Sequence, residues 1–292
     1  MKKRKVFVTI LIAAVILLLG GYFFIKTLNP RKRVYGDRLT PVKVETMSFY
    51  NPSGQKINGK LYMKEDAPGK MPLIIMCHGL GARMAWAEDY CRTFASRGWA
   101  AYSFDFRGGS EESSSDGSTF DMSIMTELDD VSLIIEKLLK ERFVDRKNIF
   151  LVGESQGGQV AALAAAKYKK DIRGLVLFYP AFSIQDDIHK KFSRERDLPD
   201  STSFGFITIG KTYFKDVWRL DPFKKIGKYK GPVLILHGDE DAIVPYHYSE
   251  KALVTYQDAF LEKFEGAGHG FSGEDKTKAI RLTAEFIDRH IR

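Results

Sequence analysis

A serine on a glycine-flanked turn is the feature that most constrains this chain. Residues 148–152 form a short apolar run typical of a buried strand, Gly153-Glu154-Ser155-Gln156-Gly157 follows, and residues 159–167 are rich in alanine, as in a closely packed helix. We expect the turn to strain the backbone of Ser155, and side chains at 153 and 157 to collide with the neighbouring helix and strand. Ser155 would then stand at the amino end of a helix, whose dipole favours developing negative charge.

A serine hydroxyl is a weak nucleophile at neutral pH, so it needs a base, and the base needs an orienting carboxylate. The candidate base is His269, in Gly266-Ala267-Gly268-His269-Gly270-Phe271, because it follows a strand-like run at 260–264 and its flanking glycines leave the imidazole free to reach Ser155. Three other histidines lie in polar or charged segments, and we expect them at the surface: His189, His247 and His290.

The candidate acid lies in a turn with three carboxylates. An apolar strand-like run at 233–237 leads into Gly238-Asp239-Glu240-Asp241. We predict that Asp241 is the acid, because it lies past the strand end, where a loop can turn its carboxylate toward the His269 ring. Asp239 is the alternative, although it could instead cap the turn through its own backbone. Glu240 is expected to face solvent.

Four local motifs carry a family resemblance. They are Phe104-Asp105-Phe106-Arg107-Gly108, Gly153-Glu154-Ser155-Gln156-Gly157-Gly158, His237-Gly238 with Asp241, and Gly266-Ala267-Gly268-His269-Gly270-Phe271. From about residue 42 onward the chain resembles the α/β-hydrolase superfamily, in which the catalytic residues follow the order Ser, Asp, His. Within it, the chain is most similar to bacterial feruloyl and cinnamoyl esterases. It departs from that group at 108–112, which usually hold a Gly-His-Gly turn, and at Glu154, which replaces a common histidine.

The resemblance also implies two backbone N–H donors for the oxyanion of the tetrahedral intermediate. One is Gln156, the residue after the nucleophile. The other is Leu80, because the strand-like run at 72–76 opens into His78-Gly79-Leu80-Gly81, where the glycines let the backbone approach the substrate. His78 precedes the serine in the chain, so we expect it to brace this loop by hydrogen bonding rather than to act as the base.

The remaining pattern predicts one α/β domain. Strand-like and helix-like segments alternate, which indicates a mostly parallel sheet covered by helices on both faces. An antiparallel hairpin at 42–50 and 57–64 is followed by strands near 72–77, 99–105, 148–153, 174–179, 232–237 and 259–264, which makes eight. We predict an N-terminal anchor and flank at 1–38 and an α/β-hydrolase catalytic domain at 39–292.

The interval 183–230 is too long for a simple connection and predicts a small lid inserted after the sixth strand. Its aromatic residues either line a pocket for an apolar or aromatic acyl group or form the lid's own core. They are Phe192, Phe204, Phe206, Tyr213, Phe214, Trp218, Phe223 and Tyr229.

The N-terminus resembles a signal anchor. Four basic residues at 2–5 precede an uncharged stretch from Val6 to Ile25, which is long enough for a transmembrane helix and longer than a usual secretory signal core. No small-residue cleavage pattern follows. Because equal numbers of basic residues flank the span, the orientation rests on the export-like order of basic tip and apolar stretch. This order favours a single-pass protein of the cell membrane with an extracytoplasmic catalytic domain.

The basic balance of the chain comes from this terminus. Residues 1–38 contain nine Lys or Arg and one Asp, which leaves 36 basic and 36 acidic residues in the remainder. A nucleic-acid partner therefore has no support. No phosphate-binding loop or metal-spaced His/Cys cluster occurs, so we expect no cofactor and no metal.

These features predict a serine carboxylesterase acting on small or hydroxycinnamoyl-type esters. The alternatives are a lipase or monoacylglycerol hydrolase, then a serine peptidase, then a non-catalytic binding protein of hydrolase fold.

Overall fold

The computed structural model describes residues 41–67, 69–204 and 207–292, and its second compact unit runs from Thr40 to Arg292. The strands of its main sheet are β1 (Val42–Thr46), β4 (Gly59–Lys64), β5 (Met71–Cys77), β6 (Ala100–Phe104), β7 (Val144–Glu154), β8 (Ile172–Phe178), β11 (Val233–Gly238) and β12 (Ala259–Phe264). Two short strand pairs are β2 (Phe49–Tyr50) with β3 (Lys56–Ile57) and β9 (Ser201–Phe204) with β10 (Ile207–Gly210). The α-helices are α2 (Glu88–Ser96), α3 (Ile124–Leu138), α4 (Ser155–Lys167), α5 (Ile184–Lys191), α6 (Lys211–Val217), α7 (Pro222–Ile226), α8 (His247–Thr255) and α9 (Gly273–His290).

The eight main strands form one sheet in the order β1-β4-β6-β5-β7-β8-β11-β12. β4 pairs antiparallel with both β1 and β6, and the remaining neighbours pair in parallel. The predicted eight-stranded, mostly parallel sheet is therefore confirmed. Six neighbouring strands of this sheet run in one direction: β6, β5, β7, β8, β11 and β12. Their carboxyl ends therefore meet at one edge of the sheet, where parallel sheets place their ligand sites.

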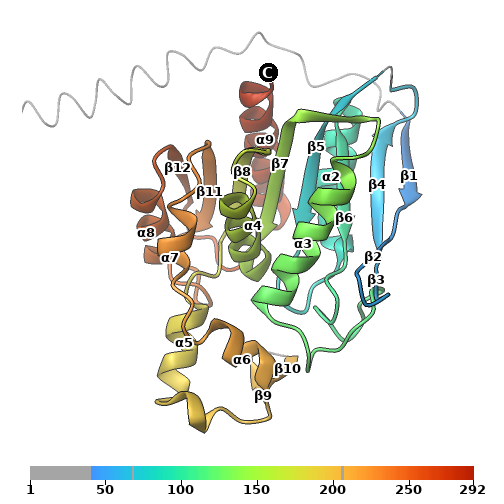
Figure 1. Cartoon of the computed structure of the whole chain (residues 1–292). Coiled ribbons are helices and arrows are strands. Elements are labelled where there is room, and N and C mark those ends of the chain that lie inside the picture. The colour runs from blue at the N-terminus through green and yellow to red at the C-terminus, as the bar shows by residue number, and fades with distance from the viewer. Residues whose placement is uncertain (1–40, 68, 205–206) are drawn as a thin grey trace, which may run out of the picture. The chain divides into compact units, whose positions relative to one another are not determined.

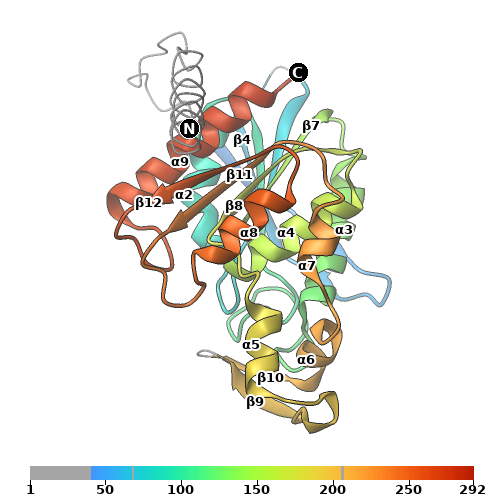
Figure 2. The same ribbon diagram turned by 90° about the vertical axis from the view of Figure 1, so that its left-hand side faces the viewer.

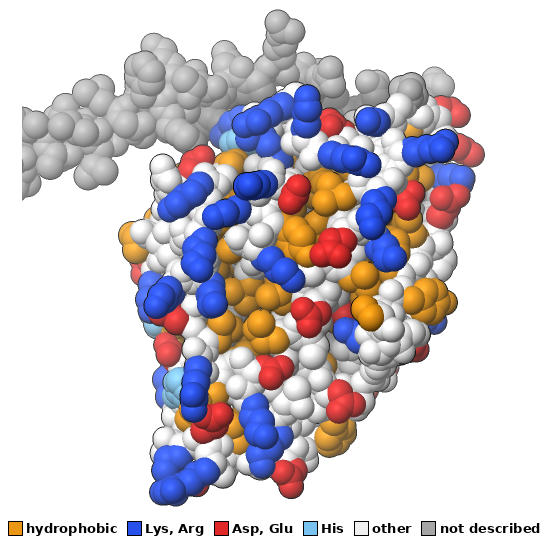
Figure 3. All heavy atoms as spheres, in the orientation of Figure 1, with side chains coloured by type: hydrophobic (Ala, Val, Ile, Leu, Met, Phe, Trp, Pro, Cys, Tyr) orange, Lys and Arg blue, Asp and Glu red, His pale blue; other side chains and the backbone are white. Residues whose placement is uncertain are grey.

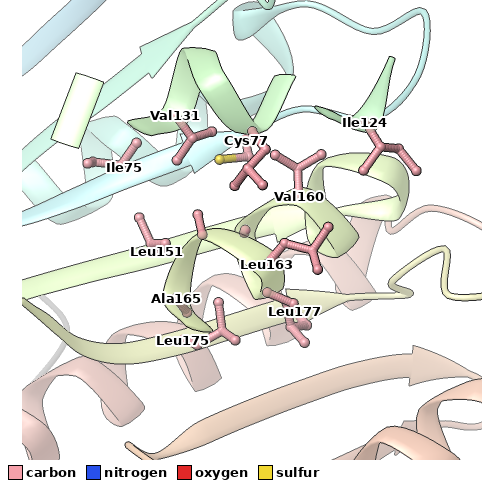
Figure 4. Close-up of a cluster of buried hydrophobic side chains, with 14 of the residues drawn as sticks. Ile75, Cys77, Ile124, Val131, Leu151, Val160, Leu163, Ala165, Leu175 and Leu177 are labelled. Atoms are coloured by element: carbon pink, nitrogen blue, oxygen red, sulfur yellow. The ribbon is translucent and has the colours of Figure 1, made fainter. Parts of the chain in front are cut away.

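Helices cover both faces of the sheet (Figures 1 and 2). α2 and α9 pack on one face, and α3, α4, α7 and α8 pack on the other. The central strands have continuous apolar sequences because both of their faces are buried. On the α3–α4 face, side chains of β5, β7 and β8 interdigitate with Val131 of α3 and Val160 and Leu163 of α4 (Figure 4).

The predicted N-terminal hairpin differs in detail from the structure. β1 pairs with β4 as expected, but it ends at Thr46, and Phe49 and Tyr50 pair with β3 in a separate ribbon. The side chain of Asn51 causes the tight turn between β2 and β3, because its Oδ1 accepts hydrogen bonds from the N–H groups of Ser53 and Gln55.

The segment 183–230, which we call the lid segment, leaves the sheet after β8 and extends beyond its carboxyl edge (Figure 1). Two hydrogen bonds attach its helix α6 to the main body. The Tyr213 hydroxyl donates to Gln156 Oε1 at 2.6 Å, and Ser123 Oγ, at the start of α3, donates to Asp216 Oδ2 at 2.6 Å.

Within the described ranges, no helix is both long enough and apolar enough to cross a membrane. The span predicted from Val6 to Ile25 lies outside the described residues and stays a prediction.

Candidate active site

Ser155 lies at the sharp turn between β7 and α4, and its backbone is strained as predicted, with a φ of +49°. A side chain at Gly153 would place Cβ 2.3 Å from Gly157 O, in the helix. A side chain at Gly157 would place Cβ 2.2 Å from His78 O, after the neighbouring strand. Only glycine fits at either position, which confirms the predicted collisions. The turn leaves Ser155 half-buried at the amino end of α4.

The His269 imidazole joins Ser155 to Asp241. Its Nε2 lies 3.0 Å from Ser155 Oγ, and its Nδ1 lies 2.7 Å from Asp241 Oδ2. Because Asp241 is an acceptor, Nδ1 carries the hydrogen and Nε2 is free to take the serine proton. Gly270, with a φ of +98°, allows the loop after β12 to turn the ring into this position. The edge of the Tyr179 ring contacts the imidazole at a centroid distance of 4.7 Å.

Asp241 is buried after β11, and both of its oxygens accept hydrogen bonds. Oδ1 accepts the N–H groups of Ile243 and Val244 at 2.8 and 2.9 Å. Burial alone would raise the pKa of Asp241, but hydrogen bonds from His237, His269 and Val244 outweigh burial and hold that pKa well below its usual range. The carboxylate therefore stays ionised beside the imidazole.

The alternative acid, Asp239, lies outside this arrangement. Its Oδ1 accepts the Gly266 N–H at 2.7 Å, and its Oδ2 lies 3.2 Å from Lys263 Nζ. Glu240 is exposed, as expected. Of the three carboxylates in the turn, the structure brings only Asp241 to His269.

His237 is a site residue that the sequence reasoning missed. The side chain is fully buried, and its Nε2 lies 3.1 Å from Asp241 Oδ2 and 3.0 Å from Val244 O, both acceptors. Nε2 therefore carries the hydrogen, and Nδ1 accepts the Ser249 hydroxyl at 2.6 Å. Asp241 is thus held between two imidazoles. The available signal was the placement of His237 four residues before Asp241, at the end of a buried strand.

The two predicted oxyanion donors flank Ser155. The Gly79 N–H donates to Glu154 Oε1 at 3.2 Å, and the Gly81 N–H donates to Gly109 O at 2.9 Å. Leu80 N, between them, has no acceptor among the described residues. Gln156 lies in the first turn of α4, where N–H groups have no partner within the helix. Both N–H groups are therefore available to a ligand.

The other histidines form no hydrogen bond with Ser155 among the described residues. His78 is buried and braces the loop, since its Nδ1 lies 2.8 Å from Gly79 O and its Nε2 accepts the Phe106 N–H at 3.0 Å. His189 and His247 are exposed, and His290 is half-buried near the end of α9.

Glu154 and Tyr179 form a hydrogen-bonded pair beside the nucleophile, and the sequence analysis did not predict this pair. Glu154 is buried, and its Oε2 accepts the Tyr179 hydroxyl at 2.7 Å. Burial raises the pKa of Glu154 to about 7, although the hydrogen bonds from Tyr179 and Gly79 partly offset this effect. Tyr179 has a φ of +37°, a strained conformation that places its ring between Glu154 and the imidazole. A backbone strain of this kind leaves no mark in a sequence.

A cavity of about 480 Å³ opens in front of Ser155. Its walls are mostly apolar and include Leu80, Ile184 and Ile243. Two carboxylates, Glu154 and Asp187, also line it. The described lid aromatics are not among its walls. Tyr213, Phe214 and Tyr229 are buried in the hydrophobic core on the α3–α4 face of the sheet, and Phe192, Trp218 and Phe223 pack against it. These six aromatic residues therefore join the core of the domain, and form neither the cavity wall nor a separate core of the lid. Phe206 lies outside the described residues.

Comparison with known proteins agrees with this geometry. The family described as serine aminopeptidase, S33 (Hydrolase_4) matches residues 70–199, a range that includes Ser155 and ends before Asp241 and His269. Among solved structures, Est1E from Butyrivibrio proteoclasticus with ferulic acid bound is 26% identical, with a TM-score of 0.76. The similarity covers 84% of this chain and 98% of Est1E. This chain belongs to the α/β-hydrolase superfamily.

Curated relatives within the superfamily are distant. The AB hydrolase superfamily protein YisY of Bacillus subtilis (strain 168) is 26% identical over 256 residues, which cover 73% of this chain and 90% of YisY. The monoacylglycerol lipase ABHD6 of Bos taurus is 28% identical over 202 residues, or 69% of this chain, and the match spans just over half of the lipase, at 56%. The hydrolase is of the esterase and lipase type.

Proposed function

We propose that this hydrolase is a serine carboxylesterase acting on small or hydroxycinnamoyl-type esters. The observation that carries the proposal is the unbroken hydrogen-bonded series from Asp241 through His269 to Ser155, at the mouth of an apolar cavity. The nucleophile lies within hydrogen-bonding distance of the base, and the base lies within hydrogen-bonding distance of the orienting acid, as acyl transfer requires.

The mechanism follows from this geometry. His269 Nε2 takes the proton from Ser155 Oγ as the oxygen attacks the ester carbonyl. The N–H groups of Leu80 and Gln156 stabilise the oxyanion. Asp241 keeps the imidazole oriented and stabilises it when it is charged. His269 then protonates the departing alcohol, and water attacks the acyl-enzyme with His269 again acting as the base.

The shape and polarity of the cavity support the substrate class. A cavity of about 480 Å³ falls within the range that encloses a small organic ligand, and its apolar walls suit an aromatic or short aliphatic acyl group. The bound ferulic acid in Est1E, a protein of similar fold, also favours a hydroxycinnamoyl group.

Two other activities have support of their own. A monoacylglycerol hydrolase would also use apolar walls, and ABHD6 is a monoacylglycerol lipase. A serine peptidase would suit the matched aminopeptidase family, because Glu154 and Asp187 could bind a substrate ammonium group.

We also propose that Val6 to Ile25 anchors the enzyme to the cell membrane, with the catalytic domain outside the cytoplasm.

The test compares the full-length chain, kept in a mild detergent, with Ser155→Ala and with a control, Ser193→Ala, at an exposed serine of the lid segment. The substrates are short and long p-nitrophenyl esters, methyl ferulate and an aminoacyl p-nitroanilide. We expect ester turnover that falls by about 10³–10⁶ in Ser155→Ala and is unchanged in the control. Preference for long chains would favour the lipase, and turnover of the anilide alone would favour the peptidase. Turnover independent of Ser155 would refute the mechanism.

A further inference from the structure

A second cavity, of about 490 Å³, lies away from Ser155 and is strongly basic. Seven Lys or Arg residues line it, against the two carboxylates Asp171 and Asp258. Six of the seven side chains are exposed, and only Arg173 is half-buried. We use the name amino-end surface for five of these six, all except Arg292: Arg146, Lys147, Lys169, Lys170 and Lys230. Figure 3 shows Lys and Arg side chains gathered over the upper part of one face of the molecule.

The charges of the amino-end surface are not neutralised within the domain. None of its five cations has a carboxylate at salt-bridge distance among the residues that the structure describes. Many other surface cations are paired, including Arg83 with Glu112 and Lys278 with Glu262. Since residues 39–292 contain equal numbers of basic and acidic residues, this local excess is offset elsewhere on the domain. The uneven distribution creates a positive field at one place.

The strand register places this surface opposite the active site. Arg146 and Lys147 lie in the first part of β7, and Lys230 precedes β11, so the cavity lies at the amino edge of the sheet. Ser155 follows the last residue of β7, at the carboxyl edge. At about 3.3 Å per strand residue, the distance between Arg146 and Ser155 is about 30 Å.

The chain also enters the domain at the amino edge. Val42, the first residue of β1, pairs with Lys64 at the end of β4. Because β4 runs against the other strands and its Tyr62 pairs with Ala101 near the start of β6, the Lys64 end lies at the amino edge. Val42 therefore lies at the edge that carries the basic cavity, and the anchor proposed above precedes it in the chain.

We propose that the amino-end surface docks on the anionic phospholipid headgroups of the membrane that holds the chain. Each headgroup phosphate would lie against two or more unpaired cations, and the field near an anionic membrane attracts basic residues within a Debye length. Docking turns the carboxyl edge, with Ser155 and its cavity, away from the bilayer. The enzyme would then take its substrate from the aqueous phase.

A nucleic-acid partner fits this surface less well. Single-stranded nucleic acids bind where aromatic side chains stack on the bases, and none of the residues that line this cavity is aromatic.

The test measures how close each end of the domain comes to a bilayer. The full-length chain is placed in lipid nanodiscs with a donor dye at Gln257→Cys, just before β12 at the amino edge, or at Ser193→Cys in the lid segment. The native Cys77 and Cys91 are buried and remain unlabelled. Acceptor dye is placed on the lipids. We expect efficient transfer from residue 257 in bilayers with phosphatidylglycerol, weak transfer from residue 193, and a lower signal from residue 257 in pure phosphatidylcholine.

The matched variants reverse equal charge at the two ends. Each Lys or Arg near an anionic membrane raises partitioning about fivefold, so Lys169→Glu with Lys230→Glu should lower the ratio of docked to undocked domains by at least 25-fold. Arg196→Glu with Lys215→Glu, exposed in the lid segment, should leave docking unchanged. Hydrolysis of a short p-nitrophenyl ester by the first variant would show that it is folded. About 1 M salt, which shortens the Debye length to about 3 Å, should also release the domain.

Three results would overturn the proposal. They are equal transfer in the two lipid compositions, equal loss in the two double variants, and docking that survives Lys169→Glu with Lys230→Glu. Inorganic polyphosphate could instead bind to the wild-type chain and not to Lys169→Glu with Lys230→Glu, while lipid composition has no effect. The surface would then bind a soluble polyanion, and the membrane proposal would be wrong.

Discussion

Replacing Glu127 by glutamine should stabilise the hydrolase, and more strongly at higher pH. The Glu127 side chain, on α3, is fully buried, and neither carboxyl oxygen has a hydrogen-bond partner among the described residues. Burial raises the pKa of Glu127 from the usual 4.5 to about 8, although the nearby Gln156 amide partly offsets this effect. Glutamine has nearly the same shape as glutamate but no titratable proton. It therefore avoids the free-energy cost of keeping Glu127 protonated in the folded protein at a pH at which the unfolded chain ionises it.

The size of the effect follows from linkage. Because the folded pKa is raised, the contribution of Glu127 to stability is fully present below pH 4.5 and is lost as pH rises to about 8. Each pH unit within that window costs about 1.4 kcal/mol. The loss is therefore about 1 kcal/mol at pH 5 and about 3 kcal/mol at pH 7, and Glu127→Gln removes it.

Urea unfolding of the full-length chain in detergent, followed by tryptophan fluorescence at pH 5 and pH 7, measures both values. The difference in unfolding free energy between Glu127→Gln and wild type should grow by about 2.5 kcal/mol between the two pH values. Glu111→Gln, at an exposed position, is the control and should show no such growth. A difference that is independent of pH would refute the reasoning, because Glu127 would then be ionised in the folded protein at both pH values.

Three further substitutions test the site. Asp241→Asn should lower kcat by about 10⁴ by favouring the wrong imidazole tautomer, whereas Asp239→Asn should lower it less than tenfold; similar losses would contradict the assignment of the acid. Gly157→Ala should abolish folding or activity, whereas Gly69→Ala, which has no atom within 4 Å of the added Cβ, should be tolerated; circular dichroism and ester turnover test both, and an active Gly157→Ala enzyme would contradict the predicted collision. His237→Leu should lower kcat by about 10–100-fold with little change in KM, because one charge-assisted hydrogen bond to Asp241 is lost; wild-type kcat would show that His237 only fills space.

Much of the architecture could be predicted because strand-like apolar runs and glycine turns are local signals. The eight strands were placed within a few residues, but β7 begins at Val144 rather than near 148, since polar residues 145–147 extend the strand beyond the apolar core. The helix after the turn begins at Ser155 itself, because Gln156 to Gly158 adopt helical conformations despite two glycines.

The residues that support the site could not be predicted in the same way. Glu154 is the last residue of β7 and Tyr179 follows β8, and their pairing depends on a strained φ at Tyr179. The role of His237 depends on Ser249, which α8 brings to its other nitrogen. Such partners are set by tertiary packing, whereas Ser155, Asp241 and His269 each follow a strand that the pattern already indicated.

The attachment of the lid segment determines how substrate reaches the serine. A swinging lid would break the hydrogen bond between the buried Tyr213 hydroxyl and Gln156 Oε1, at a cost of about 1–3 kcal/mol. The lid segment is therefore held in place and does not swing open as a gate. It contributes Ser183, Ile184 and Asp187 to the cavity, whereas Leu80 and the largely exposed Ile243 line the cavity from outside the lid segment. Hydrolysis should begin without a lag when substrate is added, with or without a lipid interface.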